Sequence, residues 1–192
     1  MKNKEANFIL ESLVPPLVRN ILLMVRYRCI IHPSAKILFP RNLTIGRGSR
    51  VGKCDIAAQG PIIIGENCKI GDYAILNSKK GYISIGSESA INEFCIIQGS
   101  GGVEIGQRCA IAPSVKFLKN HIIPVDKNAK YGSTTDKLTK VGRNVWIGAD
   151  TVIIDGVAVG DYTIVGANSF VNKNIPSSVV AAGTPVRVIK SR

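Results

Sequence analysis

The chain has two histidines, and one of them lies among other polar side chains that could take part in acid–base chemistry. His121 belongs to a stretch that also holds Asp126 and Tyr131, whereas His32 precedes Pro33 and is predicted to be structural. An imidazole changes charge near neutral pH, so His121 could remove a proton from a hydroxyl group that attacks a carbonyl. Asp126 or a backbone carbonyl could orient the imidazole, and the sequence does not distinguish between them.

The five cysteines are an odd number, which excludes a complete set of intrachain disulfides. Cys68, Cys95 and Cys109 recur at a position that small residues also occupy, so they are predicted to be core residues. Cys29 and Cys54 show no spacing typical of a metal site. Two histidines also cannot build a three-histidine zinc site. We therefore expect no metal and a reducing, cytoplasmic compartment.

The formal net charge is +12, from 25 basic and 13 acidic residues. Such a balance allows nucleic acid, an anionic membrane surface or a phosphorylated small molecule as partner. The basic residues are spread along the chain and aromatic residues make up only 6% of it, which disfavours a stacking platform for nucleic acid. We therefore expect a phosphorylated cofactor, with anionic lipid as a second partner.

The candidate functional residues named above must be positioned by the rest of the fold. In the stretch 45–171 an aliphatic residue recurs every six positions. A hexapeptide period is typical of a parallel β-helix, in which three short strands make one triangular coil and each coil pairs with its neighbours. Glycine often follows the aliphatic residue, and a small residue often stands four positions after it. The predicted aliphatic slots are Ile45, Val51, Ala57, Ile64, Ile70, Leu76, Ile85, Ile91, Ile97, Ile105, Ile111, Phe117, Val141, Ile147, Ile153, Val159, Val165 and Val171.

The aliphatic and small residues are predicted to point into the prism, where each buried aliphatic contributes about 1.5–3 kcal/mol before chain entropy is subtracted. The glycines are expected to supply the backbone angles of tight corners. Ile31 and Ile37, with Ala35 as the small residue between them, predict an incomplete first coil.

Most breaks in the period are small, with steps of seven, nine and eight residues between successive triplets of slots. The step from Phe117 to Val141 is 24 residues, so 18 residues exceed the period and must leave the prism as a loop, predicted at 118–138. Long loops in compact domains are usually functional or disordered. This loop carries His121.

The N-terminal segment is predicted to be helical. Pro15 and Pro16 precede an apolar run, 17–28, that is shorter than the roughly 20 residues a membrane-spanning helix needs, and no cleavage site typical of a signal peptide follows it. The helix is expected to cap the open end of the prism or to lie on a membrane as a basic amphipathic helix. One domain is predicted, with the helical segment at 1–30, the β-helix at 31–175 and a tail at 176–192.

The segments Ile111–Pro113, Asn144–Gly148 and Val180–Ile189 resemble the hexapeptide-repeat acyltransferases, in particular the branch of galactoside, maltose and xenobiotic O-acetyltransferases. The resemblance covers roughly residues 45–190. It implies an all-β fold, a left-handed parallel β-helix with a short N-terminal helix and a protruding loop. The hand comes from the resemblance, because left-handed connections break the usual crossover rule. The resemblance also implies acetyl-CoA as cosubstrate and a cyclic homotrimer with active sites between subunits.

The resemblance further implies roles for individual residues. His121 matches the catalytic base, and we expect direct transfer because no serine or cysteine with a paired base is evident. Asn92 and Trp146 would line the acceptor site, although Asn92 could be a corner residue that tolerates positive φ and Trp146 could pack between subunits. Basic residues near the C-terminus would bind the phosphates of coenzyme A, unless they form a solvated tail. The residues matched to the cofactor site are Ala149, Ala167, Lys173, Arg187 and Lys190.

Together these features favour an acetyl-CoA-dependent O-acetyltransferase that acts on a sugar hydroxyl in cell-surface polysaccharide biosynthesis. The basic N-terminal segment favours a lipid-linked or cell-envelope saccharide as acceptor, at the inner face of the membrane. Alternatives within enzymes are N-acetyl transfer to an amino nucleotide-sugar and O-acetyl transfer to a xenobiotic. A non-catalytic β-helix scaffold is the alternative of a different class, but it would not need an 18-residue insertion that bears a histidine.

Overall fold

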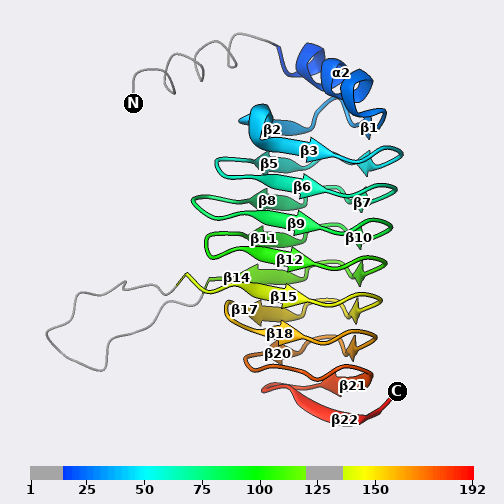
Figure 1. Ribbon diagram of the computed structural model, residues 1–192, viewed down its shortest axis with the longest axis vertical. Helices are drawn as coiled ribbons and strands as arrows, with labels where there is room; N and C mark the ends of the chain where they lie inside the picture. The colour runs from blue at the N-terminus through cyan, green and yellow to red at the C-terminus, as the bar shows by residue number, and fades with distance from the viewer. Residues whose placement is uncertain (1–14, 120–135) are drawn as a thin grey trace, which may run out of the picture.

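The computed structural model describes residues 15–119 and 136–192, as one α-helix followed by a stack of short strands (Figure 1). Each coil of the chain contributes strands to three parallel sheets, which we call sheet A, sheet B and sheet C. The coils succeed one another along the long axis of the molecule. The predicted parallel β-helix with one N-terminal helix is therefore confirmed, and its left hand stays a prediction.

The elements are short, and most strands have two or three residues. Helix α2 spans Pro16–Tyr27, and the 3-10 helix η1 spans Pro40–Asn42. Sheet A contains β1 (Ile30–Ile31), β4 (Arg50–Val51), β7 (Lys69–Ile70), β10 (Ala90–Ile91), β13 (Ala110–Ile111), β16 (Trp146–Ile147), β19 (Ile164–Val165), β21 (Val179–Ala182) and β22 (Arg187–Ser191). Sheet B contains β2 (Lys36–Leu38), β5 (Asp55–Ala57), β8 (Ile75–Asn77), β11 (Ile96–Gln98), β14 (Lys116–Leu118), β17 (Val152–Ile154) and β20 (Phe170–Val171). Sheet C contains β3 (Leu43–Ile45), β6 (Ile62–Ile64), β9 (Ile83–Ile85), β12 (Val103–Ile105), β15 (Thr139–Val141) and β18 (Ala158–Val159).

The aliphatic slots form ladders inside the prism, because each strand pairs in register with the equivalent strand of the next coil. In sheet B the ladder includes Ile56, Leu76 and Ile97, which are at most 1% exposed. One predicted slot is wrong, since Ile56 and not Ala57 points into the prism. Both residues are apolar, so only the pairing of Ile56 with Leu76 decides which of them is buried.

The slot for small residues is also confirmed. Cys68, Cys95 and Cys109 are buried in it, and Cys29 and Cys54 occupy the same slot two positions before a buried isoleucine. All five thiols are free. The cysteines are spaced along the chain as this slot is spaced in the repeat.

The glycines of the repeat have a different role from the predicted one. Gly65 and Gly71 lack positive φ, which falls two positions later in each coil, for example at Tyr73 with φ 59°. A Cβ atom on Gly65 would lie 2.5 Å from the backbone nitrogen of Ser87, and one on Gly71 would lie 2.6 Å from the carbonyl carbon of Asn92. Close approach of stacked backbones therefore requires these glycines.

The N-terminal end of the prism is closed by α2. The first coil is incomplete as predicted, because β1 and β2 pair with β4 and β5 and no described strand of sheet C precedes β3. The Asn20 side-chain amide donates a hydrogen bond to the carbonyl of Ala35 at 3.0 Å, and the Tyr27 hydroxyl donates one to the carbonyl of Leu43 at 2.7 Å. These bonds and the buried Leu23 hold the helix on the first coil.

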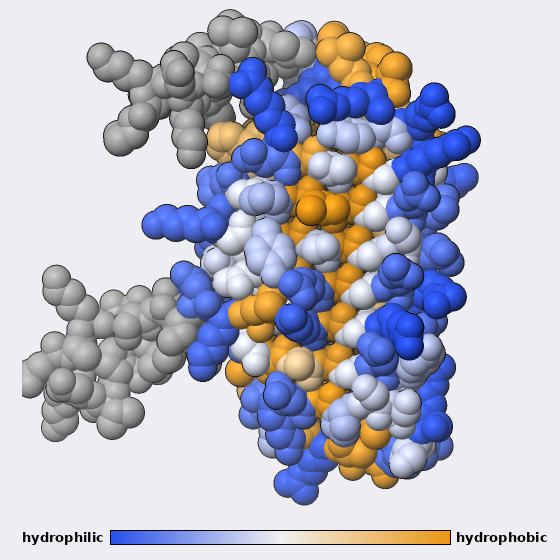
Figure 2. Space-filling model, viewed as in Figure 1, coloured by the Kyte–Doolittle hydropathy of each residue, from blue (hydrophilic) through white to orange (hydrophobic). Residues whose placement is uncertain are grey.

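The C-terminal end is closed by a hairpin. Strands β21 and β22 are antiparallel, and β21 pairs with β19, so the predicted tail extends sheet A. On the face seen in Figure 2, polar side chains line the long edges of the molecule, while apolar surface lies between them and over α2.

The residues in excess of the six-residue period gather at one corner of the prism. They are 58–61 between β5 and β6, 78–82 between β8 and β9, and 99–102 between β11 and β12. The long insertion leaves the prism between β14 and β15, at the same corner between sheet B and sheet C (Figure 1). Stacking therefore brings four segments that are far apart in sequence to one edge.

Candidate functional site

The described part of the long insertion is its base, and His121 lies outside the described residues. Lys119 and Asp136, where the described chain stops and resumes, form an ion pair. The Lys119 side chain is only 15% exposed, and its backbone N–H donates to the side-chain oxygen of Gln98 at 3.2 Å. Because the ion pair joins the segment that follows β14 to the segment that precedes β15, the insertion begins and ends at one defined place.

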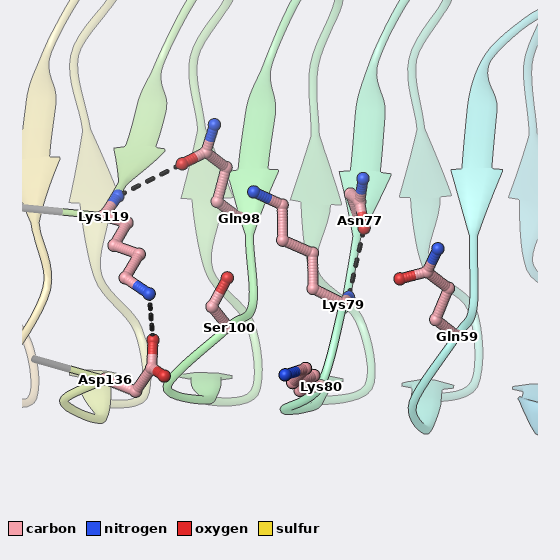
Figure 3. A pocket seen from close by; sticks show the side chains of 8 residues that line it. All are labelled: Gln59, Asn77, Lys79, Lys80, Gln98, Ser100, Lys119 and Asp136. Atoms are coloured by element: carbon pink, nitrogen blue, oxygen red, sulfur yellow. Dashed lines mark hydrogen bonds and ion pairs between the residues drawn. The ribbon is translucent and has the colours of Figure 1, made fainter. Parts of the chain in front are cut away.

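A hollow of about 550 Å³ opens beside this base, along the corner between sheet B and sheet C (Figure 3). Its wall combines the ends of β8 and β11 with the corner segments of the neighbouring coils. The residues of this wall were not predicted from the sequence. The steps longer than six residues, which recur from coil to coil, were a signal that extra residues gather along one edge of the prism. The hollow is lined by Gln59, Asn77, Lys79, Lys80, Gln98, Ser100, Lys119 and Asp136.

Asn92 lies in the column of residues that follow the aliphatic slots of sheet A. Its φ is not positive, so the predicted alternative role as a positive-φ corner residue is wrong; that conformation occurs at Phe94, with φ 60°. The Asn92 side-chain amide donates to the carbonyl of Ile111 in the next coil at 2.8 Å, and the side chain is half-buried. Its contact with an acceptor stays a prediction.

Asn92 and the base of the insertion do not come together within one chain. Asn92 precedes β11, whereas Lys119 follows β14, so the two residues lie at opposite ends of the strands of sheet B.

Trp146 faces outward, as predicted. It is 53% exposed on β16, with Ala110 and Ile164 beside it in the neighbouring strands of sheet A. Trp146 thus offers an apolar surface that can pack on a ligand or on another chain.

The predicted cofactor residues Ala149 and Ala167 stack on each other. Asn168 donates its backbone N–H to the carbonyl of Ala149 at 2.8 Å, and a Cβ atom on Gly148 would lie 2.4 Å from the nitrogen of Ala167. Gly166 also has no space for a side chain, because a Cβ there would meet Ala182 at 2.8 Å. This corner therefore presents backbone with little side-chain cover.

The three predicted phosphate-binding cations are exposed but do not form one cluster. Arg187 pairs with Ala182 at the corner that also holds Ala167, whereas Lys190 pairs with Val180 toward the other end of sheet A. Lys173 follows β20 at the far end of sheet B. Arg187 is therefore the cation placed beside the Ala149 and Ala167 column.

The buried cysteines cannot serve as acyl carriers at neutral pH. Burial, followed by the charges of Asp55 and Asp72, raises the pKa of the Cys54 thiol to about 12, and burial also raises the pKa of Cys95 to about 11. A protonated, enclosed thiol is a poor nucleophile. Across residues 15–119 and 136–192, no cluster of three or more histidine, cysteine or acidic side chains is arranged to hold a metal ion.

Comparison with known proteins identifies the repeat. Residues 138–173 match the family model described as bacterial transferase hexapeptide (six repeats). WbbJ of Escherichia coli (strain K12), named as an O-acetyl transferase of lipopolysaccharide biosynthesis, is 28% identical over 91% of this chain and 86% of that protein. Galactoside O-acetyltransferase of the same strain is 37% identical over 66% of this chain and 62% of that protein. The chain thus spans about three fifths of the galactoside enzyme.

A solved structure shows the same architecture. Galactoside acetyltransferase in complex with coenzyme A is 27% identical, covers 90% of this chain and 69% of its own, and superposes with a TM-score of 0.52. The relatives found by sequence and the solved structure are all named as acetyltransferases.

Proposed function

The chain belongs to the hexapeptide-repeat, coenzyme A-dependent acyltransferases, and on that premise we propose that it transfers an acetyl group from acetyl-CoA to a hydroxyl of a saccharide. The relatives named for galactoside and for lipopolysaccharide support a saccharide as acceptor and cell-surface polysaccharide biosynthesis as the setting.

One observation carries the proposal. The prism is interrupted once by a long insertion, and a polar hollow of saccharide size opens beside the ion-paired base of that insertion. His121 follows Lys119, a residue of the wall of the hollow, by two positions in the sequence. This sequence neighbourhood supports the assignment of the hollow to the acceptor.

In the proposed reaction, His121 accepts the proton of the acceptor hydroxyl as its oxygen attacks the thioester carbonyl. The tetrahedral intermediate carries a negative oxygen, which backbone N–H groups beside the thioester would stabilise. Its collapse breaks the C–S bond, and the imidazolium returns the proton to the departing coenzyme A sulfur. Direct transfer needs no acyl-enzyme, which agrees with the protonated, buried thiols of the described chain.

The corner at Ala149 and Ala167 suits the extended arm of coenzyme A, because the glycines and alanines there carry no long side chains that would block an approach. The exposed guanidinium of Arg187 lies at the same corner and suits a phosphate through bidentate hydrogen bonds. Lys173 and Lys190 would add charge at longer range.

The active site is proposed to form between chains of a cyclic homotrimer. The placement of Asn92 and Lys119 at opposite ends of the strands of sheet B supports this, since a neighbouring chain could bring the base of its insertion to Asn92. Exposed Trp146 would line the acceptor site of the neighbouring chain. Sedimentation equilibrium should give three times the 20.6 kDa mass of one chain, and a mass of one chain would contradict the proposal.

The function is tested by thiol release from acetyl-CoA with a panel of acceptors. We expect release that depends on saccharides, with a product that alkaline hydroxylamine cleaves, because O-acetyl esters react with it and amides do not. A hydroxylamine-resistant product on an amino nucleotide-sugar would favour N-acetyl transfer, and selective acetylation of chloramphenicol would favour a xenobiotic. Release that no acceptor increases would favour a non-catalytic scaffold.

Contact of α2 with the inner face of a membrane is a further part of the proposal. No helix among the described residues has the length and apolarity to cross a bilayer. The solvent-facing side of α2 nevertheless exposes five apolar residues beside the exposed Arg26 and Arg28, which suits an anionic lipid surface. These residues are Leu17, Val18, Ile21, Leu22 and Val25.

Liposome flotation tests the membrane contact. The protein should float with vesicles that contain anionic lipid, and Leu22→Glu with Val25→Glu should abolish flotation, because carboxylates do not enter the lipid interface. Ile63→Glu, on the exposed face of sheet C, is the matched control and should float like the parent. Equal flotation of all three proteins would show that α2 does not bind the membrane.

A further inference from the structure

The hollow at the corner between sheet B and sheet C has a strongly basic wall. The wall contains three lysines, Lys79, Lys80 and Lys119, and one acidic residue, Asp136. Asp136 is engaged by Lys119. Within residues 15–119 and 136–192, Lys79 and Lys80 form no ion pair, so the hollow keeps two cations that a ligand could neutralise.

Two amide side chains in the wall use their oxygens to accept hydrogen bonds from the backbone. The Asn77 side-chain oxygen accepts the backbone N–H of Lys79 at 3.1 Å, and the Gln98 side-chain oxygen accepts that of Lys119 at 3.2 Å. Only the oxygen of an amide can accept such a bond, so each NH₂ group is turned away from that backbone. In Figure 3 the Lys79 side chain extends toward Gln98.

The Ser100 hydroxyl, in the same wall, is buried and lacks a hydrogen-bond partner among the described residues. Together with the amides and lysines, it makes a surface rich in N–H and O–H donors. Such a surface complements ligand oxygens that only accept hydrogen bonds, as in a carboxylate or a phosphate.

The hollow is separate from the expected position of the coenzyme A phosphates. Lys79 belongs to the coil of β8, whereas Lys173 follows β20, four strands further along sheet B. Coils are spaced by about 4.8 Å, so the two lysines belong to levels roughly 19 Å apart. The charge of the hollow therefore calls for an anion other than that of the cofactor.

We infer that the acceptor is an acidic saccharide, whose carboxylate or phosphate binds Lys79 and Lys80 and the amides of Asn77 and Gln98. This rests on the proposed function, since the hollow is assigned to the acceptor through its position beside the insertion that carries His121. The anionic group anchors the saccharide at the corner, and a hydroxyl of the same molecule is then presented toward the base.

Calorimetry with three probes tests the inference on the full chain. Glucuronic acid and glucose 1-phosphate should each bind at least about tenfold more tightly than glucose, and the tighter of the two identifies carboxylate or phosphate as the anion. Lys79→Gln with Lys80→Gln should remove the preference, whereas Lys79→Arg with Lys80→Arg should keep it. Coenzyme A affinity should be unchanged in both variants, and raised salt should weaken the two acidic probes alone.

Lys140→Gln is the matched control, because Lys140 is an exposed lysine on sheet C, paired with Glu104 outside the hollow. It should bind all three probes like the parent. Equal affinity of the parent for acidic and neutral probes would overturn the inference while leaving saccharide acetylation intact. Acidic probes that bind through Lys79 and Lys80 without any acetyl transfer would instead overturn the proposed function and leave the anion site standing.

Discussion

His121→Ala should lower kcat for acetyl transfer by about 10²–10⁴-fold, because the acceptor hydroxyl would then lose its proton to water alone. Coenzyme A affinity should stay at the parent value, since the imidazole acts on the acceptor hydroxyl. Thiol release under saturating acetyl-CoA measures the first quantity, and calorimetry with coenzyme A measures the second. A variant that turns over at the parent rate would remove His121 from the mechanism.

His32→Ala is the matched control for this loss. His32 is exposed in the first coil, and its Nδ1 atom accepts the backbone N–H of Ser34 at 3.1 Å. We expect its removal to leave kcat within about twofold of the parent, because surface substitutions rarely affect a distant site. The parent rate should also fall as the pH drops and imidazole becomes protonated, whereas the residual rate of His121→Ala should not follow that titration.

Phe117→Ala should reduce the free energy of unfolding by about 3–5 kcal/mol, because it leaves a cavity inside the prism. Phe117 is 1% exposed and lies in register between Ile97 and Ile153. Urea unfolding, followed by circular dichroism and by the fluorescence of Trp146, measures the change. A loss below about 1 kcal/mol would mean that the neighbouring coils collapse into the space.

Phe94→Ala is the control of the same chemistry. Phe94 is 56% exposed and stacks on Tyr73, with ring centroids 5.2 Å apart. Its loss should cost no more than the roughly 0.5–1.5 kcal/mol of an aromatic pair. The difference between the two phenylalanine variants thus measures burial in the prism.

The sequence by itself determined the repeat. The aliphatic residues at six-residue steps predict the ladders of the prism, and Leu76 and Ile97 are buried as expected. The length of the step from Phe117 to Val141 predicts the insertion. These features are local, since inward and outward positions follow from the spacing of a few residues along one strand. The choice of His121 as base came from its position and the resemblance, and it stays a prediction.

The tertiary structure decided which residues are buried and which become neighbours, where the spacing of residues along the sequence does not. It selected Ile56 over Ala57, and it showed that Gly71 is required by the backbone of the next coil. It also placed Lys79, Gln98 and Lys119 in the wall of one hollow, at the base of the insertion. Residues about 20 apart in sequence become neighbours when coils stack at roughly 4.8 Å, and no local pattern encodes which side chains then share a surface.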